Sequence, residues 1–193
     1  GQVVVIHDDR LDRTTDGTGP VSSRSLAEIR QLDAGAWFGA RYAGARIPTL
    51  GEVLERYGGR AHLHIEIKGQ TSGLVPAAVT LIRERGLQAH VTITSFHLSA
   101  LEETRQLAPE LPTGWLVGNV DEAIIADTLH LGLTQLCPRA DRVTAEMVDD
   151  LHARGLVVRA WGVSDEGLMR DAIEAGVDGM TVNFPDVLLA ALA

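Results

Sequence analysis

The sequence of 193 residues lacks the features that mark several classes of protein. It holds one cysteine, Cys137, which excludes an internal disulfide and a zinc site built from several cysteines. No apolar run approaches the roughly 20 residues that span a bilayer, so no transmembrane segment is expected. No G-x-G-x-x-G motif is present to mark a dinucleotide site. Positive charge is also scarce, because 17 Lys and Arg stand against 26 Asp and Glu.

The resulting net charge of -9 disfavours nucleic acid or an anionic membrane surface as a partner. The rest of the composition, 45% hydrophobic with a mean hydropathy of +0.07, is that of an ordinary globular protein. No signal peptide is visible, which predicts a cytoplasmic location. The chain begins at Gly1 inside an apolar run, which we interpret as a cut end, so a leader could have preceded it.

From residue 49 onward, short apolar strands alternate with amphipathic helices, the pattern of parallel βα units. The predicted strands are 63–68, 91–96, 112–117, 133–138, 156–163 and 179–184. The predicted helices are 50–57, 74–86, 98–108, 121–131, 144–154, 165–175 and 186–192. Capping boxes are expected at Thr49 with Glu52 and at Ser99 with Glu102. Glycines at 86, 132, 155 and 176 each follow a helix, where a left-handed residue is favoured.

Residues 1–48 interrupt this alternation and read as an insertion-like segment. VVVIHD predicts a strand, residues 12–20 a polar loop, and Ser25 with Glu28 the start of a short helix over residues 25–32. The irregular stretch 34–48 holds Trp37, Phe38 and Tyr42, which we expect to anchor it. We expect a single domain over residues 1–193, with six βα units in 49–193.

The side-chain pattern favours a TIM-type (β/α)8 barrel over an open doubly wound sheet. In residues 62–68 the polar side chains His62, His64, Glu66 and Lys68 share one face, opposite Leu63, Ile65 and Ile67. A central strand of a doubly wound sheet is apolar on both faces, whereas a barrel strand has a lumen face. A typical barrel needs roughly 250 residues, so the first strand, first helix and second strand are expected to be missing from this chain.

His7 lies at the end of the first predicted strand, before Asp8 and Asp9. It either caps the following loop through hydrogen bonds or acts as a general acid or base. Glu66 and Lys68 point the same way, roughly 7 Å apart along a strand. They form either a buried ion pair or a site in which the carboxylate binds Mg²⁺ or Ca²⁺ and the ammonium meets a phosphate oxygen.

Arg159 and Trp161 share a face of the strand at 156–163. Trp161 either forms a wall of a substrate pocket or fills the barrel.

Several motifs together resemble the glycerophosphodiester phosphodiesterase family. They are VVVIHDDRLDRTTDGTGPV, LDAGAWFGARYAGARIPTLGEVL, HIEIKG, TSF, VVRAWGV and AGVDGMTVNFPD, in that order along the whole chain. The resemblance implies an eight-stranded α/β barrel with a small insertion after its second strand. It also implies metal-dependent hydrolysis of glycerophosphodiesters to glycerol 3-phosphate and an alcohol, with Mg²⁺ or Ca²⁺ as cofactor and the small-molecule diester as partner.

By the same resemblance, His7 matches one of two catalytic histidines and Lys68 the catalytic lysine near the phosphate. Glu66 matches a metal-binding acid, and Phe96 and Trp161 match residues near the substrate. The family's H-R-G and E-x-D motifs would lie upstream of Gly1, so this chain alone is not expected to be active. The attacking group is left open between water and the glycerol 2-hydroxyl. The alternative is a truncated, non-catalytic barrel that acts as a binding or scaffold protein.

Overall fold

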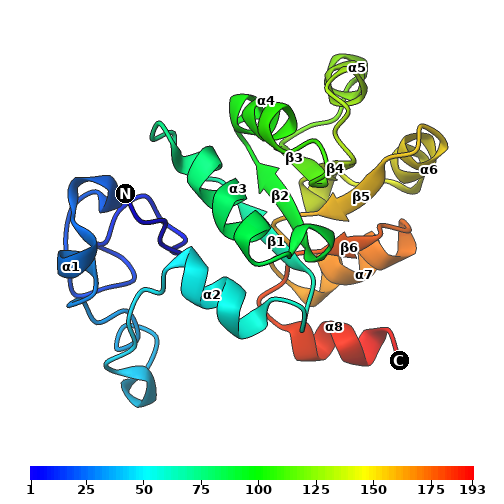
Figure 1. Cartoon of the computed structure of the whole chain (residues 1–193). Coiled ribbons are helices and arrows are strands. Elements are labelled where there is room, and N and C mark those ends of the chain that lie inside the picture. The colour runs from blue at the N-terminus through cyan, green and yellow to red at the C-terminus, as the bar shows by residue number, and fades with distance from the viewer. The chain divides into compact units, whose positions relative to one another are not determined.

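The computed structural model describes all residues from Gly1 to Ala193 and divides them into two compact units. The first unit comprises Gly1–Leu63 and Lys68–Val91, and the second comprises His64–Ile67 and Thr92–Ala193. Figure 1 labels the helices and strands of both. That residues 1–193 form a single domain stays a prediction.

The start of the first unit is held by a single antiparallel bridge between Val4 and Thr49. The amide of Val5 donates to Pro48 O and the amide of Leu50 donates to Val3 O, both over 2.9 Å. The prediction of a strand over VVVIHD is therefore wrong. A ladder cannot extend here, because Pro48 has no amide to donate and Thr49 already begins a helix.

Short helices make up the regular structure of the first unit. They are the 3₁₀ turns Val21–Ser23, Ala40–Tyr42 and Gln88–His90 and the helices α1 (Leu26–Ile29), α2 (Leu50–Tyr57) and α3 (Leu74–Glu84). The predicted capping boxes of Ser25 with Glu28 and of Thr49 with Glu52 both form. Helix α3 buries Val75, Val79 and Ile82 on one face, the spacing of an amphipathic helix.

The aromatic side chains of the first unit's irregular stretch lie on its surface. Trp37, Phe38 and Tyr42 are 50%, 67% and 39% exposed, so they do not anchor this stretch by burial. They pack on one another instead, with centroids 5.6 Å apart for Trp37 and Phe38 and 5.2 Å for Phe38 and Tyr42. The core under this region is made by Leu11, Ile29 and Ile47.

The second unit is built on parallel strands in sequential order, β1 to β6. The strands are β1 (Leu63–Glu66), β2 (Val91–Ser95), β3 (Thr113–Val117), β4 (Gln135–Pro138), β5 (Val157–Ala160) and β6 (Gly179–Met180). A doubly wound sheet reverses its strand order at a switch point, and this sheet does not. The predicted α/β barrel architecture is confirmed in its six βα units.

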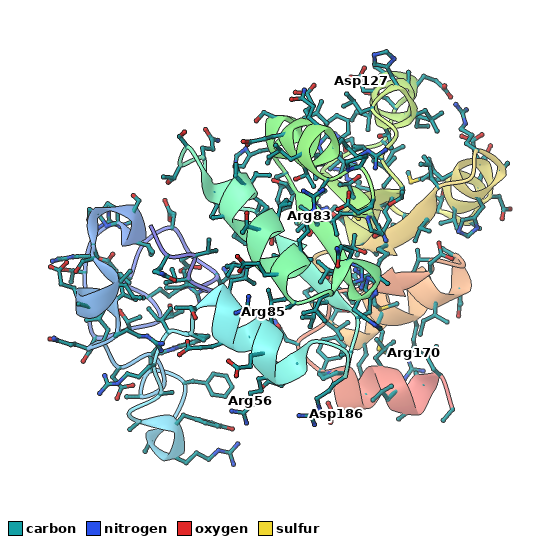
Figure 2. The ribbon with its side chains drawn as sticks, in the orientation of Figure 1. Arg56, Arg83, Arg85, Asp127, Arg170 and Asp186 are labelled. Carbon is teal, nitrogen blue, oxygen red and sulfur yellow. The ribbon has the colours of Figure 1, made fainter.

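A helix follows each of the strands β2 to β6. Figure 1 shows α4, α5, α6 and α7 on the outer side of the strands. The helices are α4 (Leu98–Leu107), α5 (Glu122–His130), α6 (Ala145–Ala153), α7 (Glu166–Glu174) and α8 (Pro185–Ala191), with a 3₁₀ turn at Ala140–Arg142. The capping box predicted at Ser99 is wrong, because α4 begins at Leu98 and places Ser99 inside its first turn. Asp127 of α5 and Arg170 of α7 lie on the outer surface (Figure 2).

The inner faces of these helices pack against the strands and form hydrophobic clusters in the second unit. Val117, Leu136 and Val158 of three neighbouring strands pack against Ile125 of α5 and Leu151 of α6. Gly86, Gly132, Gly155 and Gly176 adopt the predicted positive φ, at 65°, 64°, 79° and 84°. None of the helices is long and apolar enough to cross a membrane.

Candidate active site

His7 lies in the bend that follows Val4, and its imidazole is oriented by Asp8. The distance from His7 Nδ1 to Asp8 Oδ1 is 2.7 Å. Arg13 holds the same carboxylate with two donors, Nε to Oδ2 over 2.6 Å and Nη2 to Oδ1 over 2.7 Å. His7 is 75% exposed, whereas Asp8 is only 22% exposed. The exposed imidazole is thus tied to a carboxylate that the protein shields.

The hydrogen bond to Asp8 selects the tautomer of the ring. Hydrogen bonds from Arg13 and then from His7 hold the pKa of Asp8 far below its ordinary value. The hydrogen bond to Asp8 likewise raises the pKa of Arg13. Because an ionised carboxylate only accepts hydrogen bonds, His7 Nδ1 carries a proton. In the neutral ring the lone pair therefore lies on Nε2, the atom that can accept a proton.

The structure brings His7 and Lys68 together in the first unit. Lys68 Nζ lies 3.5 Å from His7 Nε2. At that distance the contact is at the outer limit of a hydrogen bond, and its main effect is electrostatic. Lys68 is exposed. An anion bound near His7 Nε2 would therefore also contact the Lys68 ammonium. The two predicted catalytic residues are thus neighbours, with their reactive atoms facing one another.

Three other predicted residues stand at the carboxyl ends of strands in the second unit. Glu66 is the last residue of β1, Phe96 directly follows β2, and Trp161 directly follows β5. In α/β barrels the reacting groups gather at this edge of the strands. Ser95 Oγ donates to Ile67 O over 2.7 Å, which fixes the chain just after Glu66.

Phe96 and Trp161 form an aromatic pair at this edge. Their centroids lie 4.9 Å apart and their planes are inclined by 86°, an edge-to-face contact. The indole nitrogen of Trp161 donates to Val117 O over 2.9 Å. Phe96 is exposed and Trp161 half-buried, so the pair presents an apolar surface with a fixed orientation.

Cys137 of β4 and Arg159 of β5 stand near the carboxyl ends of neighbouring strands. Burial raises the pKa of the Cys137 thiol to about 12, so it stays protonated. Burial also lowers the pKa of Arg159. Arg159 Nε lies 2.8 Å from where a Cβ on Gly179 would stand, so a larger residue at position 179 would require the Arg159 side chain to shift.

The residues present fit only part of a divalent-metal site. Glu66 offers a hard carboxylate at a strand end, and its Oε1 atom is buried. No group of three or more His, Cys, Asp or Glu side chains comes together to hold a metal ion. Mg²⁺ and Ca²⁺ each take about six or more oxygen ligands. Glu66 is therefore a candidate for one of these ligands, and the residues described here do not supply the others.

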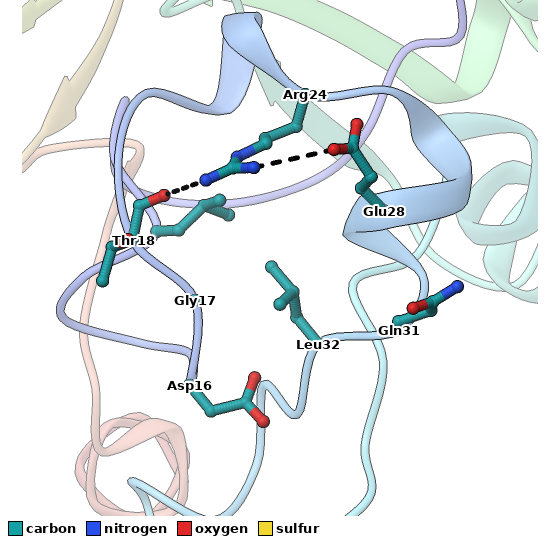
Figure 3. A pocket seen from close by; sticks show the side chains of 8 residues that line it. Asp16, Gly17, Thr18, Arg24, Glu28, Gln31 and Leu32 are labelled. Carbon is teal, nitrogen blue, oxygen red and sulfur yellow. Dashed lines mark hydrogen bonds and ion pairs between the residues drawn. The ribbon is translucent and has the colours of Figure 1, made fainter.

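A separate pocket opens in the first unit, within residues 11–32 (Figure 3). Arg24 spans it, donating to Thr18 O over 3.2 Å and pairing with Glu28 at 3.6 Å. The residues that line the pocket are Leu11, Asp16, Gly17, Thr18, Arg24, Glu28, Gln31 and Leu32. None of these is a predicted site residue, so the pocket is not the candidate active site.

Sequence analysis missed Arg13, which completes the arrangement around His7. Its contact with Asp8 depends on a turn that returns the chain after Leu11, where Leu11 N donates to Gly19 O over 2.9 Å. The sequence does place an acid at position 8 and an arginine at position 13 in one polar loop, which is the pattern that indicates such an ion pair.

Comparison with known proteins finds similarity along nearly the whole chain. The sequence model of the glycerophosphoryl diester phosphodiesterase family matches residues 1–187. The glycerophosphodiester phosphodiesterase of Caldanaerobacter subterraneus subsp. tengcongensis is 35% identical, over 98% of this chain and 79% of that protein. A glycerophosphodiester phosphodiesterase of Bacillus subtilis is 31% identical, over 97% of this chain and 71% of that protein.

Among solved structures, an Oleispira antarctica phosphodiesterase in complex with the product sn-glycerol-3-phosphate is similar, with a TM-score of 0.86 and 31% identity. The similarity covers 98% of this chain and 78% of that one.

Proposed function

Because the chain belongs to the glycerophosphoryl diester phosphodiesterase family, we propose that it hydrolyses glycerophosphodiesters to glycerol 3-phosphate and an alcohol. The observation that carries this proposal is the His7 site, in which an oriented imidazole and an ammonium lie 3.5 Å apart. The similar Oleispira antarctica enzyme, bound to sn-glycerol-3-phosphate, supports the same product.

In this proposal His7 transfers the proton and Lys68 stabilises the negative charge on the phosphate. His7 Nε2 accepts a proton from the attacking oxygen, or in its protonated form gives one to the departing alcohol. A bond forms between that oxygen and phosphorus while the bond from phosphorus to the alcohol breaks. Lys68 places a positive charge beside the phosphate oxygens, which stabilises the negative charge of the transition state.

The aromatic pair and Glu66 have binding roles. Phe96 and Trp161 offer an apolar wall against the carbon skeleton of the substrate. A divalent cation, with Glu66 as one of its ligands, supplies further charge against the phosphate when bound.

The test is the release of glycerol 3-phosphate from glycerophosphocholine by the protein that carries this chain, with Mg²⁺ or Ca²⁺ and with a chelator. We expect release that His7→Ala and the chelator both suppress. Glycerophosphoethanolamine and glycerophosphoinositol test the departing alcohol. No release from any of the three by a folded protein would contradict the proposed function.

A further inference from the structure

We propose that Arg13 is a positioning residue for His7, acting through Asp8, and that Trp37 holds the Arg13 guanidinium in place. The inference deepens the proposed function, since it rests on His7 as the acid–base group. It assigns a role to the exposed segment around Trp37, which the proposed reaction does not otherwise use.

The first step is the fork between Arg13 and Asp8. Two nitrogens of one guanidinium donate to the two oxygens of one carboxylate, over 2.6 and 2.7 Å. Such a bidentate pair fixes the plane of the carboxylate as well as its position. Asp8 Oδ1 is shared between Arg13 Nη2 and His7 Nδ1. The orientation of the carboxylate therefore decides the direction in which the imidazole is held.

The second step is the freedom of His7 without that hold. With a side chain 75% exposed, the ring has little packing to select one rotamer. The bond to Asp8 selects the rotamer and keeps the proton on Nδ1, so that Nε2 faces Lys68. If the carboxylate turned, the ring would sample other rotamers and the other neutral tautomer, in which Nε2 carries the proton and cannot accept one.

The third step is the contact between Arg13 and Trp37, which lie 24 positions apart in the sequence. The guanidinium carbon of Arg13 lies 5.7 Å from the centre of the Trp37 ring, within the range of a cation–π contact. The indole is itself fixed, because Trp37 Nε1 donates to Ala34 O over 3.0 Å. The ring thus offers a surface of defined orientation to the arginine.

The loop that carries Trp37 is held by Asp33. Its side chain accepts from the amides of Gly35, Ala36 and Gly44 over 2.8, 2.9 and 2.6 Å. These bonds tie both ends of the loop to one carboxylate and lower the pKa of Asp33. An exposed aromatic ring on a loop held in this way is suited to positioning a neighbour.

The chain offers a matched control in Arg41. Its guanidinium lies 4.6 Å from the ring centre of Tyr42 in the same segment. It donates to the Tyr42 hydroxyl and has no bond to Asp8 or His7. Replacing Arg41 removes a cation–π contact of the same kind without touching the path to His7.

The experiment compares Arg13→Gln, Arg13→Lys, Trp37→Leu and Arg41→Gln in the protein that carries this chain. For Arg13→Gln we expect kcat to fall about ten- to a hundredfold, less than the ~10²–10⁴ expected for loss of the acid–base group itself. KM should stay within about twofold and the pH profile of kcat should shift. Trp37→Leu should lower kcat severalfold, Arg13→Lys should fall between Arg13→Gln and wild type, and Arg41→Gln should match wild type.

A second readout does not depend on turnover. Nitrogen-15 NMR of labelled histidine, with the His7 signals assigned from a His7→Gln sample, reports which ring nitrogen carries the proton. We expect the Nδ1–H tautomer in wild type and in Arg41→Gln, and a mixture of tautomers in Arg13→Gln. If wild type releases no glycerol 3-phosphate, the proposed function fails, while this spectrum still decides whether Arg13 positions His7.

An Arg13→Gln protein that is folded, keeps kcat within twofold and keeps the wild-type tautomer would overturn the inference. If Arg13→Gln does not fold, Arg13→Lys takes its place, because it keeps the charge and loses the two-donor fork. A fall in kcat with a changed tautomer in Arg13→Lys supports the inference, and wild-type values for both overturn it. Equal losses in Trp37→Leu and Arg41→Gln would reject the role of Trp37.

Discussion

The indole N–H of Trp161 donates to the carbonyl oxygen of Val117 over 2.9 Å, which ties the end of β5 to the end of β3 across the intervening β4. This bond fixes the ring that meets Phe96 edge to face at 4.9 Å. The orientation of the aromatic pair therefore depends on the backbone of a third strand, as well as on the two residues themselves.

Replacing Trp161 in two ways separates these contributions. Trp161→Phe keeps a ring against Phe96 and loses the bond to Val117, which is worth about 0.5–1.5 kcal/mol. We expect KM for glycerophosphocholine to rise a few fold, since about 1.4 kcal/mol is a tenfold change. Trp161→Ala also loses the ring contact, worth roughly a further 0.5–1.5 kcal/mol, so its KM should rise about tenfold or more.

Steady-state kinetics check this prediction, with Tyr57→Ala as the control. Tyr57 is a surface aromatic residue of α2, and its replacement should leave KM unchanged. An unchanged KM in Trp161→Ala would leave Trp161 as a side chain that only fills the barrel.

His7→Ala should remove the acid–base group and little else. General acid–base catalysis contributes roughly 10²–10⁴ to the rate, so kcat should fall by that factor. The melting temperature should change little, because the His7 side chain is 75% exposed. His130→Ala, at the end of α5, is the control for losing a surface histidine. Turnover near that of wild type at saturating substrate would show that another group moves the proton.

The sequence predicted the fold correctly where the limits of a helix depend on residues close together along the chain. Thr49 and Glu52 predicted the start of α2, because the side chain of each residue accepts a hydrogen bond from the backbone amide of the other. The sequential order of parallel strands followed from the regular βα alternation and from the polar lumen face. Strand ends were less predictable. The sequence predicted a strand through residue 163, and β5 ends at Ala160, with Gly162 at a φ of 73° shortly after.

The site was predictable only in part, for a physical reason. His7, Glu66 and Lys68 could be identified from the type of each residue and, for Glu66 and Lys68, from the strand face that they share. Arg13 and Trp37 act through contacts that exist only after the loop has folded, and no spacing rule joins positions 13 and 37. The Phe96 and Trp161 contact likewise joins the ends of two strands that are 65 positions apart.

Glu66→Gln tests the assignment of a metal ligand. The replacement keeps the shape of the side chain and removes its negative charge, and hard cations prefer anionic oxygen. We expect the affinity of the protein for Mg²⁺ and Ca²⁺ to fall about tenfold or more, since one charge-assisted contact is worth roughly 1.5–3 kcal/mol. Calorimetric titration measures this directly, with the surface variant Glu55→Gln as control. Equal affinities of Glu66→Gln and wild type would place the metal elsewhere and leave Glu66 with a structural role.

Glu52 predicts how stability depends on pH in the first unit. Its carboxylate accepts from the Thr49 amide over 2.8 Å and pairs with Arg30. The hydrogen bond from Arg30, followed by that from Thr49, lowers the pKa of Glu52 from 4.5 to about 2. Because the unfolded state binds this proton first, the stabilisation is fully present above pH 4.5 and is lost as the pH falls towards 2.

Urea unfolding of wild type and Glu52→Gln between pH 6 and pH 2 measures this loss. We expect the difference in free energy of unfolding to be largest at pH 6, to shrink below pH 4.5 and to vanish near pH 2. Added salt should reduce it at pH 6, because the pair with Arg30 is exposed and screened. Thr49→Ala, which removes the cap without a charge, should cost about 1 kcal/mol at every pH above 4.5. A difference between wild type and Glu52→Gln that stayed constant from pH 6 to pH 2 would show that the charge of Glu52 contributes nothing.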